Sequence, residues 1–240
     1  MDIENKVALV TGSTRGIGKA IAEMLCKNGA IVYLNSYNSS TEGFELRDEL
    51  RNNGYRCSYI NGNVSNADDV ENIFNLIKKE QGRLEILINN AGVYLPDSVD
   101  IESYNLIHNV NSFGYYLCTV KASEVMKDFG KIINISSIWG IEPNVDSIIA
   151  SGVKAEIEHY TKAFAKKFKG KIQVNSVAPG YTKTKLLTLS LSEDYIRNVI
   201  LLTPINRLIE PCEIASTVLF LIQNDSITGQ TIVVDGGYTL

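Results

Sequence analysis

The chain has 240 residues, of which 45% are hydrophobic and 21% are charged, and its formal net charge is −4. This size and balance predict a globular protein with one large or two small domains. The acidic balance and the lack of a basic tract argue against nucleic-acid partners and against an anionic membrane surface. The longest apolar runs span about four to six residues, far fewer than a transmembrane helix needs.

The amino-terminal segment and the cysteines both indicate a cytoplasmic protein. The segment MDIENKVALV is charged and runs directly into a strand-like stretch, so it does not resemble a signal peptide. The cysteines are scattered, with no CxxC pair and no histidine cluster nearby, so we expect reduced thiols and no metal site. They are Cys26, Cys57, Cys118 and Cys212.

Short apolar runs alternate with helix-period segments along the chain. Several runs are apolar throughout, as expected of parallel strands covered on both faces. The strand-like runs are Val7–Val10, Ile31–Asn35, Cys57–Ile60, Leu84–Ile88, Lys131–Ile135, Ile172–Val177 and Thr231–Asp235. The helical segments are Ile17–Lys27, Thr41–Asn53, Ala67–Glu80, Ser103–Lys127, Asp146–Lys169 and Pro211–Ile222. This pattern predicts one α/β domain over residues 1–240, a Rossmann-type doubly wound sheet of about seven parallel strands with helices on both faces.

Residues 180–210 interrupt this alternation. They follow a strand end and show only weak helical patterning. In open α/β sheets ligands bind outside the carboxyl ends of the strands, so a long excursion at this position predicts a lid over the substrate. The alternative is a pair of surface helices without a functional role.

The first strand is followed by TGSTRGIG, residues 11–18, and then by a helix. Gly12 permits a tight turn, while Gly16 and Gly18 allow the backbone to approach a diphosphate and the helix to pack closely on the strand. The helix N-terminus offers free N–H groups and a partial positive charge to an anion. The loop therefore predicts a dinucleotide-binding site.

The glycine spacing, TGxxxGxG, resembles that of the short-chain dehydrogenase/reductase family. Further blocks resemble the family in order and spacing over essentially the whole chain: NNAG (89–92), NVNSFG (109–114), ISS (135–137), PG (179–180) and ITGQTIVVDGG (227–237). Within the family the chain looks most like the 3-oxoacyl-carrier-protein reductase branch. The resemblance implies a nicotinamide cofactor, a seven-stranded parallel sheet and a homotetramer.

The resemblance also implies a catalytic group of Asn, Ser, Tyr and Lys, and three of these match Asn111, Ser137 and Lys154. In the family the serine binds the carbonyl oxygen, the tyrosine gives it a proton, and the asparagine holds a water. The lysine holds the nicotinamide ribose and lowers the tyrosine pKa. The tyrosine should stand four residues before Lys154 and 13 after Ser137, and both counts reach Ala150. Tyr160 follows the lysine on an apolar stripe and is predicted to lie in the core, so the proton source is missing.

The choice between NADP and NAD depends on the second strand and on the glycine loop. NAD sites usually place an acid at the end of the second strand, and the segment Asn35–Asn38 contains none. Arg15 lies directly before Gly16, where a basic residue in the resembling family favours NADP through a charge-assisted bond to the 2′-phosphate. Ser36 and Asn38 can add hydrogen bonds. We therefore expect NADP(H) in preference to NAD(H); the alternative for Arg15 is a solvated loop charge.

The resemblance places further cofactor contacts in blocks along the chain. Asn63 replaces the family's usual aspartate but keeps an acceptor oxygen for the adenine amino group. Asn89 is expected either to shape the wall beside the adenosine or to bracket two strands. The complete set of predicted cofactor-binding residues is Gly12, Ser13, Thr14, Arg15, Gly16, Ile17, Gly18, Ser36, Asn63, Val64, Asn89, Ala91, Gly92, Lys154, Pro179, Gly180 and Thr182.

Three hypotheses follow from Ala150. In the first, the protein is an NADP(H)-dependent ketoreductase for a carbonyl such as a 3-oxoacyl thioester, and Ala150 is either an engineered inactivating change or tolerated at low activity. In the second, natural loss of the tyrosine has left an inactive cofactor-binding scaffold for partner proteins. In the third, the pocket performs dehydration or proton abstraction. The preserved cofactor residues favour the first hypothesis.

A substitute acid would have to come from water or from a neighbouring segment. Glu142, Asp146 and His108 are the candidates, although Asp146 is also well placed to cap the helix that follows it. The helical segments Ser103–Lys127 and Asp146–Lys169 carry more apolar residues than a single stripe requires. Such an excess favours the homotetramer that the family resemblance implies.

Overall fold

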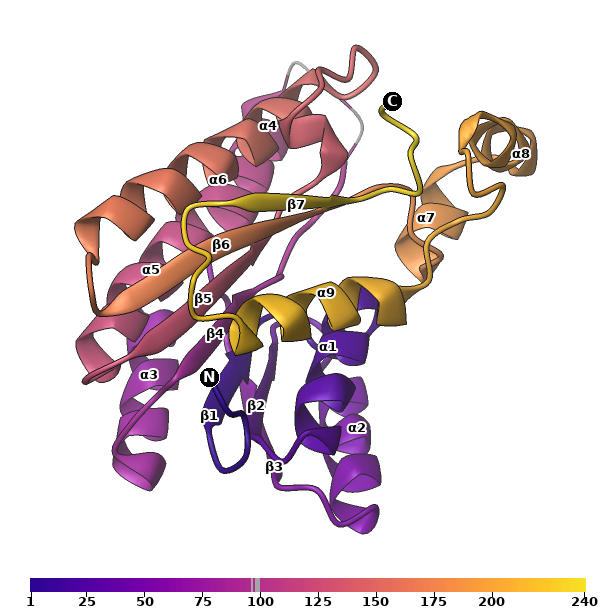
Figure 1. Cartoon of the computed structure of the whole chain (residues 1–240). Coiled ribbons are helices and arrows are strands. Elements are labelled where there is room, and N and C mark those ends of the chain that lie inside the picture. The colour runs from indigo at the N-terminus through magenta and orange to yellow at the C-terminus, as the bar shows by residue number, and fades with distance from the viewer. Residues whose placement is uncertain (96, 98–99) are drawn as a thin grey trace.

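The structure, a computed structural model, describes residues 1–95, 97 and 100–240. Within these residues seven strands form one parallel sheet in the order β3-β2-β1-β4-β5-β6-β7 (Figure 1). The strands are β1 (Val7–Val10), β2 (Ile31–Ser36), β3 (Cys57–Asn61), β4 (Ile86–Asn89), β5 (Gly130–Ile135), β6 (Ile172–Pro179) and β7 (Thr231–Val234). The predicted α/β fold with parallel strands is confirmed.

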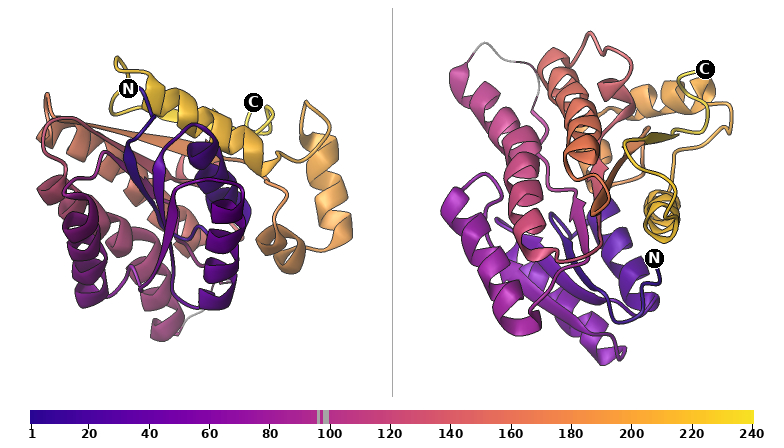
Figure 2. Two further views of the ribbon diagram at one scale, coloured as in Figure 1. Left: turned by 90° about the horizontal axis from the view of Figure 1, so that it is seen from below. Right: turned by 60° about the vertical axis from the view of Figure 1, so that its left-hand side comes forward.

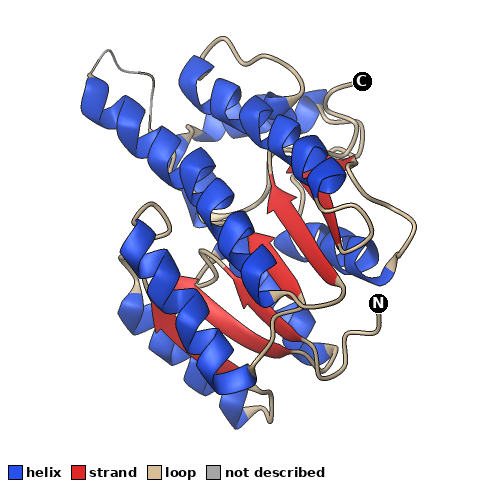
Figure 3. Ribbon diagram, turned by 90° about the vertical axis from the view of Figure 1, so that its left-hand side faces the viewer, coloured by secondary structure: helices blue, strands red, loops and turns tan. Residues whose placement is uncertain are grey.

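Helices cover both faces of the sheet (Figures 1 and 2). One layer holds α1 (Gly16–Lys27), α2 (Ser40–Asn52) and α9 (Pro211–Gln223), and its apolar core includes Ile21 and Val218. The other layer, which faces the viewer in Figure 3, holds α3 (Ala67–Gln81), α4 (Ile101–His108), α5 (Gly114–Val125) and α6 (Ile148–Lys167). Its core includes Phe74 and Cys118. Apolar burial on both faces explains why the strands are hydrophobic throughout.

The strand order reverses between β1 and β4, which determines where a ligand can bind. β1 pairs with β2 on one side and with β4 on the other, and Val10 lies opposite Ile88 in register. The chain segments that leave these two strands therefore diverge at the carboxyl edge of the sheet. Open α/β sheets bind ligands in the crevice at such a switch point.

The long helix predicted for Ser103–Lys127 is divided into three parts. α4 ends at His108, a π-helical turn covers Asn109–Phe113, and α5 begins at Gly114. A π-helical turn is a rare insertion that occurs often at functional sites. Here it carries Asn111, so the predicted regular helix is corrected at the position of a candidate site residue.

The start of α6 also differs from the prediction, because Asp146 does not cap it. The N-cap residue is Ser147, and Asp146 is exposed before it. The carboxylate of Asp97 instead accepts hydrogen bonds from the backbone N–H groups of Ile148 and Ile149, at 2.6 and 3.2 Å. A carboxylate at the first turn also complements the helix dipole. The capping residue comes from a loop about 50 positions earlier, which local sequence patterns cannot reveal.

Two short helices, α7 (Lys185–Ser190) and α8 (Glu193–Leu202), occupy the segment that was predicted to interrupt the alternation. They stand away from the sheet, beside its carboxyl edge (Figure 2). A bridge between Thr182 and Ile209 brings the two ends of the excursion together. No helix within the described residues is long and apolar enough to cross a membrane.

Candidate functional site

The glycine loop between β1 and α1 has a backbone that only glycine accommodates. Gly12 and Gly16 have positive φ angles of 62° and 56°. A Cβ atom on Gly18 would lie 2.3 Å from the carbonyl oxygen of Gly12 and 2.4 Å from Nδ2 of Asn90. The first turn of α1 therefore packs directly against the loop, as the predicted dinucleotide cradle requires.

Asn90, which was predicted only as part of the NNAG block, holds this loop in place. Its side-chain Nδ2 donates to the carbonyl oxygens of Thr11 and Gly12, at 3.0 and 2.9 Å. In return, Oγ1 of Thr11 accepts hydrogen bonds from the backbone N–H groups of Asn90 and Ala91, at 3.0 and 3.1 Å. The segments that follow β1 and β4 are thus fastened to each other at the switch point of the sheet.

The N-terminus of α1 is suited to a diphosphate. Its N-cap residue, Arg15, makes no side-chain capping bond, and its first turn contains no acidic residue. By contrast, α3 is capped by Asn66 and has Asp68 and Asp69 in its first turn. The free N–H groups and the dipole of α1 are therefore available to an anion. These features fit the phosphates of a dinucleotide.

Other predicted loop residues support the fold of the loop. The hydroxyl of Ser13 accepts a hydrogen bond from the backbone N–H of Asn35 at 2.9 Å, and Thr14 Oγ1 lies 3.0 Å from Ser39 Oγ. Both contacts tie the loop to the β2 side of the sheet. Ile17 is partly buried and packs against the apolar core.

The end of β2 is uncharged, and Arg15 is exposed and forms no ion pair in the described part of the chain. Ser36 is buried, and its hydroxyl donates to the carbonyl oxygen of Ser39 and lies 2.8 Å from the hydroxyl of Tyr59. Asn38 is exposed. Arg15 is therefore the residue of this corner with unengaged charge for a phosphate.

The acceptor oxygen of Asn63, which was predicted to contact adenine, has partners within the chain in this structure. Its Oδ1 already accepts hydrogen bonds from the backbone N–H and the hydroxyl of Ser65, at 3.0 and 2.8 Å. The acceptor that was predicted for the adenine amino group is thus engaged, and an adenine would have to replace Ser65 or bind the amide nitrogen. Val64 is buried against Gly114, where a Cβ atom would approach it to 2.9 Å.

Asn89 forms a bracket between strands in this structure. It is 1% exposed, and its Nδ2 donates to Asn134 Oδ1 at 2.9 Å and to Thr119 Oγ1 at 3.1 Å. The next two residues of the predicted cofactor wall are more accessible, since Ala91 is half-buried and Gly92 is exposed. The wall is therefore formed by the NNAG backbone beyond Asn89.

Asn111 clamps the loop that follows β4. Its Oδ1 accepts from the backbone N–H of Val93, and its Nδ2 donates to the carbonyl oxygen of the same residue, both at 2.7 Å. The side chain is 3% exposed. Both ends of the amide are therefore held by the backbone of Val93.

Ser137 and the ammonium of Lys154 both lie at the carboxyl end of β5. The Ser137 hydroxyl oxygen accepts a hydrogen bond from the backbone N–H of Trp139 at 3.2 Å, which leaves its proton free to donate. Lys154 Nζ donates to the carbonyl oxygen of Ile135 at 2.8 Å and lies 5.4 Å from the ring centre of Tyr115. Burial lowers the pKa of Lys154 to about 8, against a smaller opposite effect of the Glu158 carboxylate.

Ala150 lies between Ser147 and Ser151, and the hydroxyl groups of both serines already have hydrogen-bond partners. Ser147 lies one turn earlier on α6, with its hydroxyl 2.9 Å from that of Tyr94. Ser151 donates to the carbonyl oxygen of Trp139 at 2.5 Å. Neither Tyr94 nor Trp139 was predicted for the site, because both reach α6 from segments distant in sequence.

The surroundings of the three candidate substitute acids do not favour proton donation at Ser137. Glu142 and Asp146 are exposed to solvent. His108 stacks on Tyr104 and lies 3.8 Å from the carboxylate of Glu156. Glu156 is two residues after Lys154 on α6, so the two side chains leave the helix on nearly opposite sides. In the described part of the chain, none of these three side chains forms a hydrogen bond with Ser137.

The end of β6 completes the crevice. Gly180 packs against Asp235, where a Cβ atom would approach the Asp235 side chain to 2.6 Å. Pro179 is the last residue of β6, and Thr182 is buried with its hydroxyl donating to the Gly180 carbonyl at 3.0 Å. Thr184, which sequence reasoning missed, caps α7 and lies beside Gly16. The base of the 180–210 excursion therefore borders the glycine loop.

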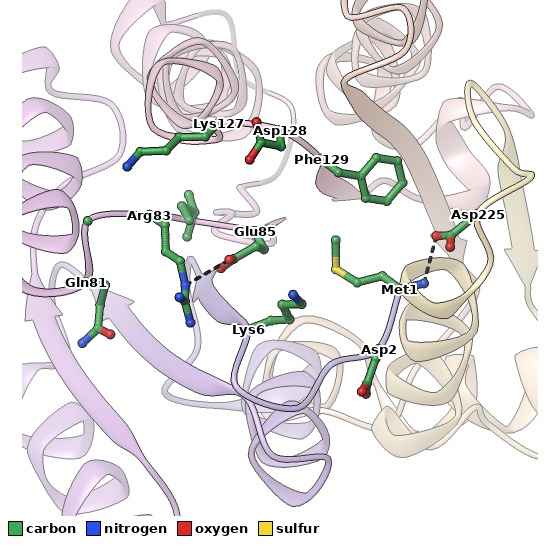
Figure 4. A pocket seen from close by; sticks show the side chains of 12 residues that line it. Met1, Asp2, Lys6, Gln81, Arg83, Glu85, Lys127, Asp128, Phe129 and Asp225 are labelled. Atoms are coloured by element: carbon green, nitrogen blue, oxygen red, sulfur yellow. Dashed lines mark hydrogen bonds and ion pairs between the residues drawn. The ribbon is translucent and has the colours of Figure 1, made fainter.

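A cavity of about 570 Å³ lies at the opposite edge of the sheet (Figure 4). Its lining includes Lys6, Glu85 and Phe129, which directly precede β1, β4 and β5. Acidic and basic side chains alternate around it, and Arg83 pairs with Glu85 at 3.0 Å. It shares no residue with the crevice at the carboxyl edge, where the predicted site residues gather.

Comparisons with known proteins agree with this geometry. A family model described as enoyl-(acyl carrier protein) reductase matches residues 12–239. The chain is 36% identical to the 3-oxoacyl-[acyl-carrier-protein] reductase of Synechocystis sp. over 98% of this chain and 97% of that protein. It is 34% identical to the Vibrio harveyi enzyme of the same name, over 99% of this chain and 98% of that enzyme. The chain belongs to the short-chain dehydrogenase/reductase family.

A solved structure of this family supports the same conclusion. A variant of actinorhodin polyketide ketoreductase, crystallised with NADPH, matches with a TM-score of 0.92 and 26% identity, covering 98% of this chain and 97% of that one. The family resemblance predicted from the sequence is therefore confirmed. This short-chain dehydrogenase/reductase is an oxidoreductase most similar to 3-oxoacyl-carrier-protein reductases.

Proposed function

We propose that the protein is an NADP(H)-dependent ketoreductase for a 3-oxoacyl thioester, with turnover impaired because Ala150 supplies no proton. The observation that carries the proposal is the location of both Ser137 and the Lys154 ammonium at the carboxyl end of β5, the edge of the sheet at which the N-terminus of α1 is open to an anion. The names of the relatives support the 3-oxoacyl substrate. The missing acid lowers the expected rate by about 10²–10⁴.

The residues present can carry out the rest of a carbonyl reduction. When bound, NADPH supplies a hydride to the carbonyl carbon. Ser137 is placed to donate its hydroxyl proton as a hydrogen bond to the carbonyl oxygen, which stabilises the negative charge that develops there. Lys154 holds positive charge one helical turn from position 150. At that position the final proton has to come from water, since alanine leaves space for one.

The preference for NADP(H) is supported by the unpaired charge of Arg15 and by the neutral end of β2. A charge-assisted contact contributes about 1.5–3 kcal/mol. Arg15→Ala should therefore weaken NADPH binding about 10- to 100-fold and leave NADH binding nearly unchanged, as measured by calorimetric titration. Lys27→Ala, at the exposed far end of α1, is the matched control. Tighter binding of NADH, or equal losses for both cofactors, would contradict the assignment.

Two other functions remain as alternatives to be tested at the same site. An inactive scaffold would bind cofactor without reducing any carbonyl, even when the acid is restored. A dehydratase or proton-abstraction enzyme would use Ser137 and Lys154 without consuming NADPH. The ketoreductase is favoured because the glycine cradle, Ser137 and the Lys154 ammonium all lie at the carboxyl edge of the sheet, where a nicotinamide and a carbonyl would have to meet.

We also propose a cytoplasmic homotetramer in which residues 180–210 act as a lid over the crevice. The four cysteines are free thiols, as in a reducing compartment. Leu106, Phe113 and Tyr116 of the α4–α5 segment are 46%, 44% and 41% exposed. Exposed apolar side chains in this number on adjoining turns suit burial by a second copy of the chain. The lid assignment is supported by the contact between Thr184 and the glycine loop.

A further inference from the structure

Aromatic side chains from three distant segments meet directly beyond Ser137. Trp139 lies in the 3₁₀ turn after β5, Tyr181 follows β6, and Tyr238 follows β7. The ring centre of Trp139 lies 6.0 Å from that of Tyr181 and 6.0 Å from that of Tyr238. The two tyrosine rings are 5.1 Å apart. We call these three residues the aromatic corner.

The three rings stand nearly at right angles to one another. The interplanar angles are 82° between Trp139 and Tyr181, 87° between Trp139 and Tyr238, and 73° between the two tyrosines. All three side chains are only half-buried. The three rings therefore pack edge-to-face on one another, and the part of each that stays accessible adds to one apolar patch beside Ser137.

The aromatic corner is fixed to the proposed catalytic elements. The backbone N–H of Trp139 donates to Ser137 Oγ at 3.2 Å, and its carbonyl oxygen accepts from Ser151 Oγ at 2.5 Å. Ser151 is the neighbour of Ala150 on α6. The backbone of Trp139 is therefore bound both to Ser137, the proposed carbonyl-binding residue, and to α6, which carries Ala150. A group bound by the aromatic corner lies close to the reacting carbonyl.

The lid reaches the same corner. Tyr195 of α8 has its hydroxyl 2.9 Å from that of Tyr181, with ring centres 6.1 Å apart. Burial and the hydrogen bond with Tyr195 raise the pKa of Tyr181, so its phenol stays neutral. Among the described residues, the side chains in these ring contacts and in the Tyr181–Tyr195 hydrogen bond are all uncharged. A neutral wall of rings favours an uncharged, flat group over a charged one.

We propose that the aromatic corner binds an uncharged ring attached to the substrate ketone, so that the preferred substrates are ring-bearing 3-oxoacyl thioesters. This inference rests on the proposed ketoreductase function and specifies its substrate class. A flat ring can pack edge-to-face or offset against the accessible part of these rings, whereas a flexible alkyl chain gains only buried area and loses rotational freedom. We expect a preference of about tenfold in affinity for a ring over a linear chain with the same number of carbons.

The test compares two N-acetylcysteamine thioesters, benzoylacetyl and 3-oxononanoyl, which have the same number of acyl carbons. Calorimetric titration in the presence of saturating NADP⁺, which cannot reduce them, measures affinity without turnover. Trp139 is the only tryptophan in the sequence, so its emission reports whether the ligand reaches the corner. We expect the benzoylacetyl ester to bind about tenfold tighter and to change the Trp139 emission more.

Variants separate the corner from general effects. Tyr238→Leu should weaken the benzoylacetyl ester about tenfold and the linear ester less than about twofold. Phe220→Leu, at an aromatic residue of α9 that is 49% exposed, should change neither affinity. Equal affinities for the two esters in the unmodified chain, or equal losses for both in Tyr238→Leu, would overturn the proposal. If circular dichroism shows that Tyr238→Leu does not fold, the same comparison of the two esters is made with Tyr181→Leu. The change of Trp139 emission in the unmodified chain then provides the second test of the proposal.

Failure of this inference is distinguishable from failure of the proposed function. Ring preference is read from binding, whereas the function is read from NADPH consumption after the acid is restored. Tight binding of the benzoylacetyl ester without reduction in Ala150→Tyr would support the corner and contradict the ketoreductase. Reduction of both esters with equal affinity would support the ketoreductase and contradict the corner.

Discussion

Restoring the missing acid is the most direct test of the site. Ala150→Tyr places a phenol on α6 one turn before Lys154, on the side of the helix that faces the carboxyl edge of the sheet. Lys154 Nζ is already held at the Ile135 carbonyl, and the Ser137 hydroxyl proton is already free. The new phenol therefore meets both groups with which a tyrosine acid cooperates in this family.

The size of the effect follows from the roles of these groups. A positioned general acid contributes about 10²–10⁴ in rate, which corresponds to roughly 3–5.5 kcal/mol of activation free energy. The pKa of Lys154 is lowered to about 8 by burial, so its ammonium carries charge at neutral pH and loses it above that value. We therefore expect the restored rate to be maintained up to about pH 8 and to fall at higher pH as Lys154 loses its proton. The dissociation constant of NADPH should remain nearly unchanged.

The assay follows NADPH absorbance with a panel of 3-oxoacyl thioesters and simple ketones. Ala150→Phe is the matched control, because it adds the same ring without the hydroxyl proton. An increase in Ala150→Tyr but not in Ala150→Phe would support proton donation. If the tyrosine variant binds NADPH normally yet reduces none of the panel, the ketoreductase proposal is refuted. A fall in some other native activity when the ring is introduced would instead favour non-redox chemistry in this pocket.

Three further predictions concern stability and assembly. Burial lowers the pKa of Lys154 to about 8 in the folded protein. Between about pH 8 and 10.5 the lysine is therefore neutral when folded and charged when unfolded, so unfolding takes up a proton. The free-energy penalty for burying the charged ammonium is greatest below pH 8. Lys154→Met should therefore raise the melting temperature at pH 7, by an amount that shrinks towards pH 10, while the exposed Lys162→Met should not; a pH-independent difference would refute this. Gly18→Ala should abolish cofactor binding and lower the stability of the fold. Gly152→Ala, with no atom within 4 Å of its added Cβ, should instead raise helix stability by about 0.5–1 kcal/mol, as measured by urea unfolding. Equal effects of the two substitutions would contradict the assignment of the glycine cradle. Tyr116→Glu should convert a tetramer to smaller species in sedimentation velocity, and a monomeric unmodified chain at micromolar concentration would exclude the proposed assembly.

The sequence alone determined the sheet, the glycine loop and the location of the vacant acid. Strand runs such as Val7–Val10 are apolar throughout because both faces of a parallel strand are buried. Consecutive residues of the sequence therefore reveal such a strand. The glycine loop is equally local, since its positive φ angles at Gly12 and Gly16 require glycine whatever the rest of the chain does. The spacing between Ser137 and Lys154 identified Ala150 because one strand, one turn and one helix connect them.

Tertiary structure alone decided which side chains are engaged and which surround the reacting group. Asn63 was assigned a free acceptor, but a turn with Ser65 uses it, and Asn111 was placed in a regular helix that is in fact a π-helical turn. The cap of α6 comes from Asp97 rather than Asp146. Each of these outcomes depends on a hydrogen bond whose partner is chosen by packing, so residue type at a single position does not determine it.

The aromatic corner shows the same limit most clearly. Tyr181 comes 42 positions after Trp139 in the sequence and Tyr238 comes 57 positions after Tyr181, and no periodic pattern connects them. They meet because β5, β6 and β7 are adjacent parallel strands that end at the same edge of the sheet, so the segments leaving them share one crevice. The sequence determined that these strands form and where each ends. Only their order in the sheet, fixed by the packing of helices on both faces, decided that three distant rings stand beside Ser137.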